Sequence, residues 1–227
     1  MEVLIRPDAF FSRIFAGEVS LKVPGLIAIV GAIVTAISAY VISGPTVKLI
    51  SGAAGSSASG AMGLIGAFGA IGGFFAFLIG YWIIIAGIFH VISVIFKGKG
   101  SFHRTLTAGG YGLIPIIIGG IISALLALYY IPLVKVPVIS SFSDPTAVTR
   151  AIAQLYADPA MREFTQISGI ISIIFLIWSA NIWIFGIKHA RELSIRNAVI
   201  TVGIPVVLLI VYIVVTTVFG VGIPGAA

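Results

Sequence analysis

The sequence predicts an all-α integral membrane protein, a five-transmembrane-helix bundle with short interfacial helices. Two observations carry this prediction. Only 9% of the 227 residues are charged and 59% are hydrophobic, whereas soluble domains carry about 25% charged residues. The chain also contains several apolar runs of the roughly 20 residues that a helix needs to cross a bilayer. So few charged residues cannot cover a folded chain of this length for contact with water, so a lipid environment is expected.

Five apolar runs qualify as membrane spans because none of them contains Asp, Glu, Lys or Arg. They are expected at residues 23–43, 72–96, 106–131, 164–187 and 199–219, within a single transmembrane domain that covers 23–219. Residues 52–71 are so rich in Gly, Ser and Ala that three interpretations stay open: a loop, a re-entrant segment, or an extension of the second helix.

The distribution of lysine and arginine predicts a cytoplasmic N-terminus and an external C-terminus, because basic residues accumulate in cytoplasmic loops. Nine basic residues would face the cytoplasm: Arg6, Arg13, Lys22, Lys97, Lys99, Arg104, Lys188, Arg191 and Arg196. Four would face the other side: Lys48, Lys135, Arg150 and Arg162. The protein is therefore expected to be a multi-pass protein of the cell membrane.

The N-terminal residues 1–22 are expected to form a cytoplasmic interfacial segment with a short amphipathic helix. Pro7 suits the first position of a helix, and Asp8 suits the positive N-terminal end of its dipole. The apolar side chains of this helix would share one face: Phe10, Phe11, Ile14 and Phe15. Such a helix is predicted to lie on the membrane surface.

The external loop, residues 132–163, is predicted to carry a short surface helix. Asp144 and Asp158 each precede a proline, which is the pattern of an N-cap residue followed by proline at the first helical position. The first of these signals would begin the surface helix and the second would begin the fourth span.

Residues 109–120, GGYGLIPIIIGG, place helix-breaking residues inside apolar sequence. Glycine lets neighbouring helices approach, and a transmembrane helix tolerates proline when other groups satisfy the freed carbonyl. We expect a bend at Pro115, near Tyr111 and Gly112, and Pro205 is a similar candidate in the fifth span. Asn181 is the most polar side chain inside a span, and an interhelical hydrogen bond or a substrate path are its two interpretations.

Residues that carry catalysis or hold cofactors are not expected. No acidic or basic residue lies in the centre of any predicted span, which weakens intramembrane proteolysis, ion-coupled transport and voltage sensing together. His90, His103 and His189 lack the spacing of a metal site, and the chain has no cysteine. The sequence also lacks a G-x-S-x-G nucleophile motif. Neither cofactor nor metal is predicted, an intramembrane hydrolase is disfavoured, and the basic residues indicate contact with lipid head groups and not nucleic acid.

In its order of motifs the chain resembles the Yip1 domain family. The likeness rests on the sequence from Leu4 to Phe11, on five spans, and on Tyr111-Gly112-Leu113-Ile114-Pro115 in the third span after a basic loop. Trp178 and a basic turn before Ala198 extend it over nearly the whole chain. The resemblance implies a membrane protein without catalytic residues. Eukaryotic members associate with Rab-type GTPases through a long cytoplasmic N-terminal region; this chain has a short one, as prokaryotic members do, which argues against GTPase binding.

The expected function is therefore a non-enzymatic polytopic membrane protein that binds lipids or partner membrane proteins, in membrane organisation or a trafficking-like role. A homo-oligomer is a further candidate assembly. The alternative is a channel or carrier for a small solute or ion, because proline and glycine can break helices around a site near the bilayer midplane.

Overall fold

The computed structural model describes residues 2–54, 59–139 and 143–219, and every regular element in these ranges is a helix. Five of the helical stretches are long and apolar enough to cross a membrane. They cover Lys22–Gly52, Gly63–Ile95, Phe102–Leu133, Pro159–Ala190 and Ile195–Val218. The predicted fold class is confirmed, and each span is longer than, or begins earlier than, the run expected from the sequence.

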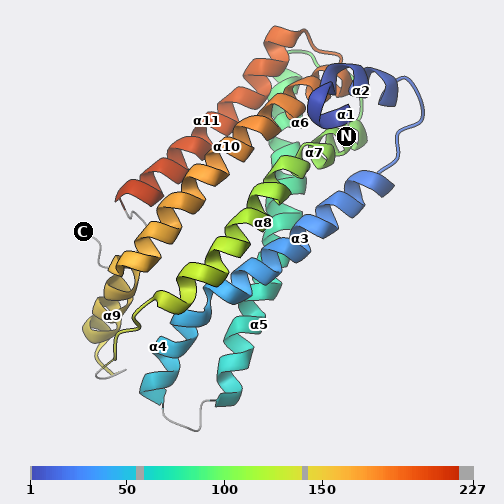
Figure 1. The fold of residues 1–227 in the computed structure, drawn as a ribbon. Helices are drawn as coiled ribbons and strands as arrows, with labels where there is room; N and C mark the ends of the chain where they lie inside the picture. The colour runs from blue at the N-terminus through green and yellow to red at the C-terminus, as the bar shows by residue number, and fades with distance from the viewer. Residues whose placement is uncertain (1, 55–58, 140–142, 220–227) are drawn as a thin grey trace.

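The first two spans form a helical hairpin along one side of the bundle (Figure 1). Its helices are α3 (Lys22–Ile42), α4 (Gly44–Ala54), α5 (Ser59–Phe75), the π-helix η2 (Ala76–Ile84) and α6 (Ile85–Ile95). The described part of segment 52–71 is therefore helical, and only residues 55–58 lie outside the description. Glycine is useful here because α5 lies against α3: a Cβ on Gly73 would stand 3.1 Å from the carbonyl oxygen of Thr35.

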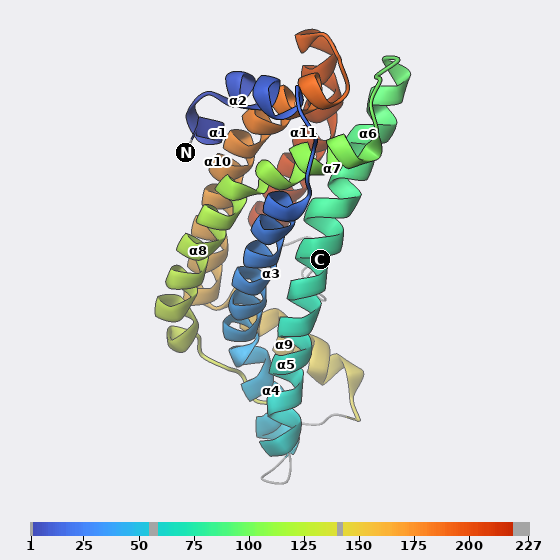
Figure 2. The ribbon, with the colours of Figure 1, turned by 90° about the vertical axis from the view of Figure 1, so that its right-hand side faces the viewer.

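The third span is broken into α7 (Phe102–Tyr111) and α8 (Leu113–Tyr130), followed by the short 3₁₀ helix η3 (Ile131–Leu133). The break lies at Gly112 and not at Pro115, where the sequence led us to expect a bend. Proline has no N–H, and its ring clashes with the carbonyl four residues earlier, that of Tyr111. The helix is interrupted directly after Tyr111, at Gly112, which has no side chain. Figure 2 shows α7 crossing the bundle at an angle to α8.

Helices α9 (Pro145–Ala157), α10 (Pro159–Ala190) and α11 (Ile195–Phe219) complete the bundle. Asp144 and Asp158 cap α9 and α10 as predicted: each carboxylate accepts hydrogen bonds from backbone N–H groups of the first turn. Leu155 of α9 is buried. Helix α9 therefore lies against the ends of the spans and is not a free element.

The two ends of the bundle differ in chemistry. We call the end that carries helices α1 (Glu2–Ile5) and α2 (Pro7–Ile14), the turn 96–101 and the turn 191–194 the basic end, and the opposite end the α9 end. Helix α10 is central, since it packs against α11, α8, α7 and α2. In both views α1 and α2 lie across the basic end (Figures 1 and 2).

The core between the two ends is apolar and closely packed. Buried side chains from α3, η2, α8, α10 and α11 form one cluster that includes Ala28, Ala32, Phe77, Leu113, Ile117, Leu176, Ile182, Val202 and Val206. Small residues allow this packing: a Cβ on Gly31 would lie 2.2 Å from the ring of Phe77, and one on Gly119 would lie 2.9 Å from that of Phe175. A smaller cluster around Leu155 fills the α9 end.

Candidate functional site at the basic end

Helix α2 docks on the bundle through its aromatic side chains. Phe11 is fully buried and Phe15 nearly so, while Phe10 is half-buried. The rings of Phe10 and Tyr111 meet edge to face at 4.9 Å between centroids, and those of Phe11 and Tyr111 at 6.0 Å. A Cβ on Gly186 of α10 would lie 3.1 Å from the Phe11 ring. The apolar face of α2 thus lies against protein, with α10 and Tyr111 as its floor.

The break at Gly112 is filled by Trp183 of α10. A Cβ on Gly112 would lie 2.1 Å from two atoms of the Trp183 indole, so only glycine fits in this arrangement. The indole Nε1 donates to the carbonyl of Gly109 at 2.9 Å. The last carbonyls of a helix lack partners within that helix, so Trp183 satisfies one of those at the end of α7.

An ion pair fastens α2 to the end of α10. Asp8 Oδ1 accepts hydrogen bonds from Lys188 Nζ and from His189 Nε2, both at 2.7 Å. These two bonds, that from Lys188 first, hold the pKa of the Asp8 carboxyl below its ordinary value. Nearer the N-terminus, Glu2 and Arg13 form a second, exposed pair.

Arg104 connects three segments at the centre of the basic end. Its Nη2 donates to the carbonyls of Phe15 and His189, each at 3.3 Å, and its guanidinium lies 4.9 Å from the centre of the Phe15 ring. Its Nε is buried without a hydrogen-bond partner among the described residues. Arg104 therefore ties α7 to the end of α2 and to the last turn of α10.

Arg191 locks the two turns of the basic end together. It is only 3% exposed, and its Nε donates to Ser93 Oγ at 2.8 Å. Its other nitrogens donate to the carbonyl oxygens of Gly98, at 2.7 Å, and Gly100. The backbone N–H of Lys99 donates in return to the Arg191 carbonyl at 2.9 Å. Burial lowers the pKa of the guanidinium.

This lock holds the turn that carries the exposed Lys97 and Lys99. Lys97 and Glu192 adopt positive φ angles of 57° and 54°, which fixes the two turns in tight conformations. At the basic end, the exposed basic side chains without a hydrogen-bond or ion-pair partner among the described residues are Arg6, Lys22, Lys97, Lys99 and Arg196. Cationic groups held in this way can bind anions such as lipid phosphates.

Six of the eight candidate residues from the sequence lie at the basic end or beside it: Pro7, Phe10, Phe11, Tyr111, Gly112 and Pro115. Pro7 and Pro115 are buried. Pro205 lies elsewhere, buried inside α11 between Val202 and Val206 of the core. Asn181 is exposed on α10. Its side-chain amide has no hydrogen-bond partner among the described residues.

Several residues of the basic end could not have been identified from the sequence alone. Trp183, Arg191 and Ser93 belong to it through contacts between distant helices, and a tryptophan or an arginine at the end of a span is common. The other two histidines have different surroundings from His189: the His90 imidazole Nδ1 is 3.0 Å from Thr105 Oγ1, and His103 is exposed. Among the described residues, no three His, Asp or Glu side chains are close enough to hold a metal ion.

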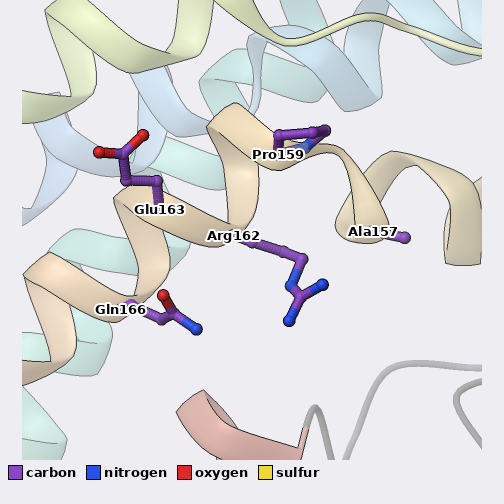
Figure 3. Close-up of a pocket in the computed structure, with 5 residues that line it drawn as sticks. All are labelled: Ala157, Pro159, Arg162, Glu163 and Gln166. Atoms are coloured by element: carbon purple, nitrogen blue, oxygen red, sulfur yellow. The ribbon is translucent and has the colours of Figure 1, made fainter.

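A shallow pocket lies at the α9 end (Figure 3). It has a volume of about 250 Å³ and is lined by Ala157, Pro159, Arg162, Glu163 and Gln166. The Tyr130 hydroxyl donates to Glu163 Oε1 at 3.0 Å, while the Arg162 and Gln166 side chains extend away from Glu163. Small-molecule sites are larger and more enclosed, at roughly 300–1,000 Å³, so the basic end remains the better candidate.

Comparison with known proteins relates the whole chain to one family. The model of the Yip1 domain matches residues 1–216. An uncharacterized protein of the archaeon Methanocaldococcus jannaschii is 40% identical over 129 residues, which cover 57% of this chain and 88% of the archaeal protein. No solved structure matches the chain.

Proposed function

Because the chain belongs to the Yip1 domain family, we propose that this multi-pass membrane protein is non-enzymatic and organises the membrane by binding anionic lipids at its basic end. We propose further that the basic end faces the cytoplasm. Partner membrane proteins would then meet the same surface.

One observation carries this proposal. Arg191 is buried and donates its hydrogen bonds to the carbonyls of Gly98 and Gly100 and to the Ser93 hydroxyl. The neighbouring Lys97 and Lys99 are therefore held at the surface, and no carboxylate is bonded to either of them. Juxtamembrane lysines and arginines each contribute about 1 kcal/mol to binding an anionic leaflet. A rigid turn limits the entropy that these side chains lose when they bind.

Retention of lipid during purification tests the proposal. Native mass spectrometry of the full chain, extracted from a membrane that contains anionic and zwitterionic phospholipids, should find anionic lipid retained in excess. Replacing both Lys97 and Lys99 by alanine should lower that excess several-fold. Lys48→Ala, which removes an exposed lysine at the α9 end, should leave it unchanged. Equal retention of both lipid classes by the unaltered protein would refute the proposal.

A channel or carrier is the second candidate function. The break at Gly112 and the π-helical segment η2 favour it, since interrupted helices and π-turns occur at transport and ligand sites. The depth at which these breaks lie is occupied by buried Phe77, Leu113 and Ile117, which favours the first proposal. Saturable flux of an ion, amino acid or sugar into vesicles containing the purified protein would decide for the second.

A further inference from the structure

Helices α5, η2 and α6 form one continuous helix along an edge of the bundle. Figure 2 shows it running from one end of the molecule to the other. It packs against α3, α4, α7 and α11, which leaves one face of it without a protein neighbour. That face is apolar over its full length, and its large exposed side chains include Leu64, Phe68, Ile71, Phe75, Ile79, Ile84, Ile88, Val91 and Ile95.

This apolar face is longer than an ordinary bilayer core. Its candidate span, Gly63–Ile95, has 33 residues, which is about 50 Å of helix at about 1.5 Å per residue. Between Lys48 and Lys97 there is no Asp, Glu, Lys or Arg. The apolar stretch of α10, by contrast, is bounded by Glu163 and Lys188 and measures about 36 Å on the same scale.

Tilt alone does not remove this difference. The hydrocarbon core of a typical bilayer is about 30 Å thick, so a helix of about 50 Å would have to tilt by about 53°. Membrane helices tilt by up to about 40°. Large apolar side chains towards both tips are well exposed, since Phe68 is 70%, Val91 67% and Ile95 75% exposed. Leaving those side chains in water would cost the hydrophobic free energy of several large residues.

We infer that the α5–η2–α6 face binds phospholipids with long acyl chains and thickens the bilayer along that edge of the protein. Lys97 and Lys99 stand at its end, where they can meet the phosphates of the same lipids. This deepens the proposed function, on which it rests, because it names the lipid by chain length in addition to head-group charge. This protein would then concentrate in, or create, thick regions of membrane.

Lipid affinity as a function of chain length tests the inference. The full chain, in vesicles of monounsaturated phosphatidylcholines from about 14 to about 22 carbons per chain, would be titrated with brominated lipids of each length, with quenching of tryptophan fluorescence as the readout. We expect relative affinity to rise several-fold towards the longest chains. An optimum at the length that gives a core of about 30 Å, or no dependence, would overturn the inference.

Labelling of single cysteines locates the tips directly, because the chain has no cysteine of its own. Leu64→Cys and Val91→Cys lie about 40 Å apart along the helix. Both should escape a membrane-impermeant maleimide in the thickest bilayers, and at least one should react in the thinnest. Lys99→Cys is the control that should react in every bilayer, and Ile174→Cys, an exposed mid-span residue of α10, the control that should never react.

The remaining outcomes also decide. Reaction of both tips in every bilayer would mean that they face water and serve a protein partner, and protection of both in every bilayer would mean that the helix tilts; either result overturns the inference. The retention experiment varies the head group, whereas these two vary chain length at a constant head group. The inference can therefore fail while the proposed function stands, and the reverse.

Discussion

At the scale of single residues, the basic end depends on glycines that face aromatic rings. Gly112 meets Trp183, Gly110 meets Pro24 and Trp82, and Gly186 meets Phe11, each so closely that an added Cβ would lie 3.1 Å or less from the neighbour. Without a hydrophobic force between helices in lipid, such close packing is a main source of association. The rings therefore hold α7, α10 and α2 in one arrangement.

Substitution of Gly112 tests this packing. Gly112→Ala would place a methyl group inside the Trp183 indole, and the cost of such overpacking is typically about 1–3 kcal/mol. We expect a clearly lower midpoint of thermal unfolding in detergent. Gly87→Ala is the matched control, since a Cβ there meets no neighbour within 4 Å, and it should leave the midpoint unchanged or raise it. Equal midpoints for the two variants would contradict the packing argument.

Replacement of Arg191 tests the lock between the two turns. Lysine lacks the planar fork that lets arginine reach several acceptors at once, so Arg191→Lys should free the carbonyls of Gly98 and Gly100. We expect faster hydrogen exchange of the backbone amides in the 97–101 turn, above all that of Lys99, whose N–H donates to residue 191. Arg196→Lys, at an exposed position, should leave exchange unchanged. Exchange as slow in Arg191→Lys as in the unaltered protein would show that the turn holds itself.

At the scale of elements, the docking of α2 depends on charge as well as on aromatic packing. The pKa of Asp8 is lowered by its bonds to Lys188 and His189, so the bound carboxylate stabilises docking at neutral pH. That stabilisation is lost as the pH falls through the lowered pKa, because the protonated acid no longer forms an ion pair with Lys188. Acid should therefore loosen α2, in a window below the ordinary pKa of an aspartate.

A fluorophore on α2 would report this release. Attached at Ser12→Cys, which is exposed, its anisotropy should stay high at neutral pH and fall on acidification through the lowered pKa of Asp8. In Asp8→Asn the anisotropy should be lower already at neutral pH and change less with acid. Glu18→Gln, another exposed acidic position, serves as control and should titrate like the unaltered protein. If the anisotropy falls with acid as much in Asp8→Asn as in the unaltered protein, a group other than Asp8 causes the release.

The same scale shows what the sequence could reveal. The caps at Asp144 and Asp158 were predictable because a cap is a local pattern of a carboxylate and a proline. The helix through residues 59–71 was not, since glycine lowers helix propensity in water but lets α5 approach α3 in the bundle. The bend was expected at Pro115, three residues after the actual break at Gly112. The sequence shows where the proline is, but not which neighbouring residue leaves the helical conformation.

Contacts between distant segments lay further beyond sequence reasoning. The spacing of Phe10 and Phe11 predicted an apolar face on α2, but not that this face would meet Tyr111. Asn181 had two interpretations, an interhelical hydrogen bond or a substrate path, and the sequence did not show that its side chain lies exposed on α10. Both outcomes depend on how helices are rotated against one another, and in an all-round apolar helix no periodicity records that rotation.

At the scale of the whole molecule, the charge asymmetry of the two ends is the main guide to orientation. The basic end carries nine lysines and arginines against four acidic residues, whereas the α9 end carries four against three. Orientation is set by lysine and arginine near the ends of spans. A cytoplasmic basic end also brings the proposed lipid-binding surface to the leaflet that holds most anionic lipid.

Labelling of single cysteines in intact cells tests this orientation. Ser12→Cys on α2 and Gln154→Cys on α9 are exposed positions at opposite ends of the bundle, and the natural chain contributes no background thiol. A membrane-impermeant maleimide added to intact cells should label Gln154→Cys alone, and should label Ser12→Cys only after the membrane is permeabilised. The reverse pattern would place the basic end outside, away from the anionic leaflet, and would remove the physical basis of the proposed lipid binding.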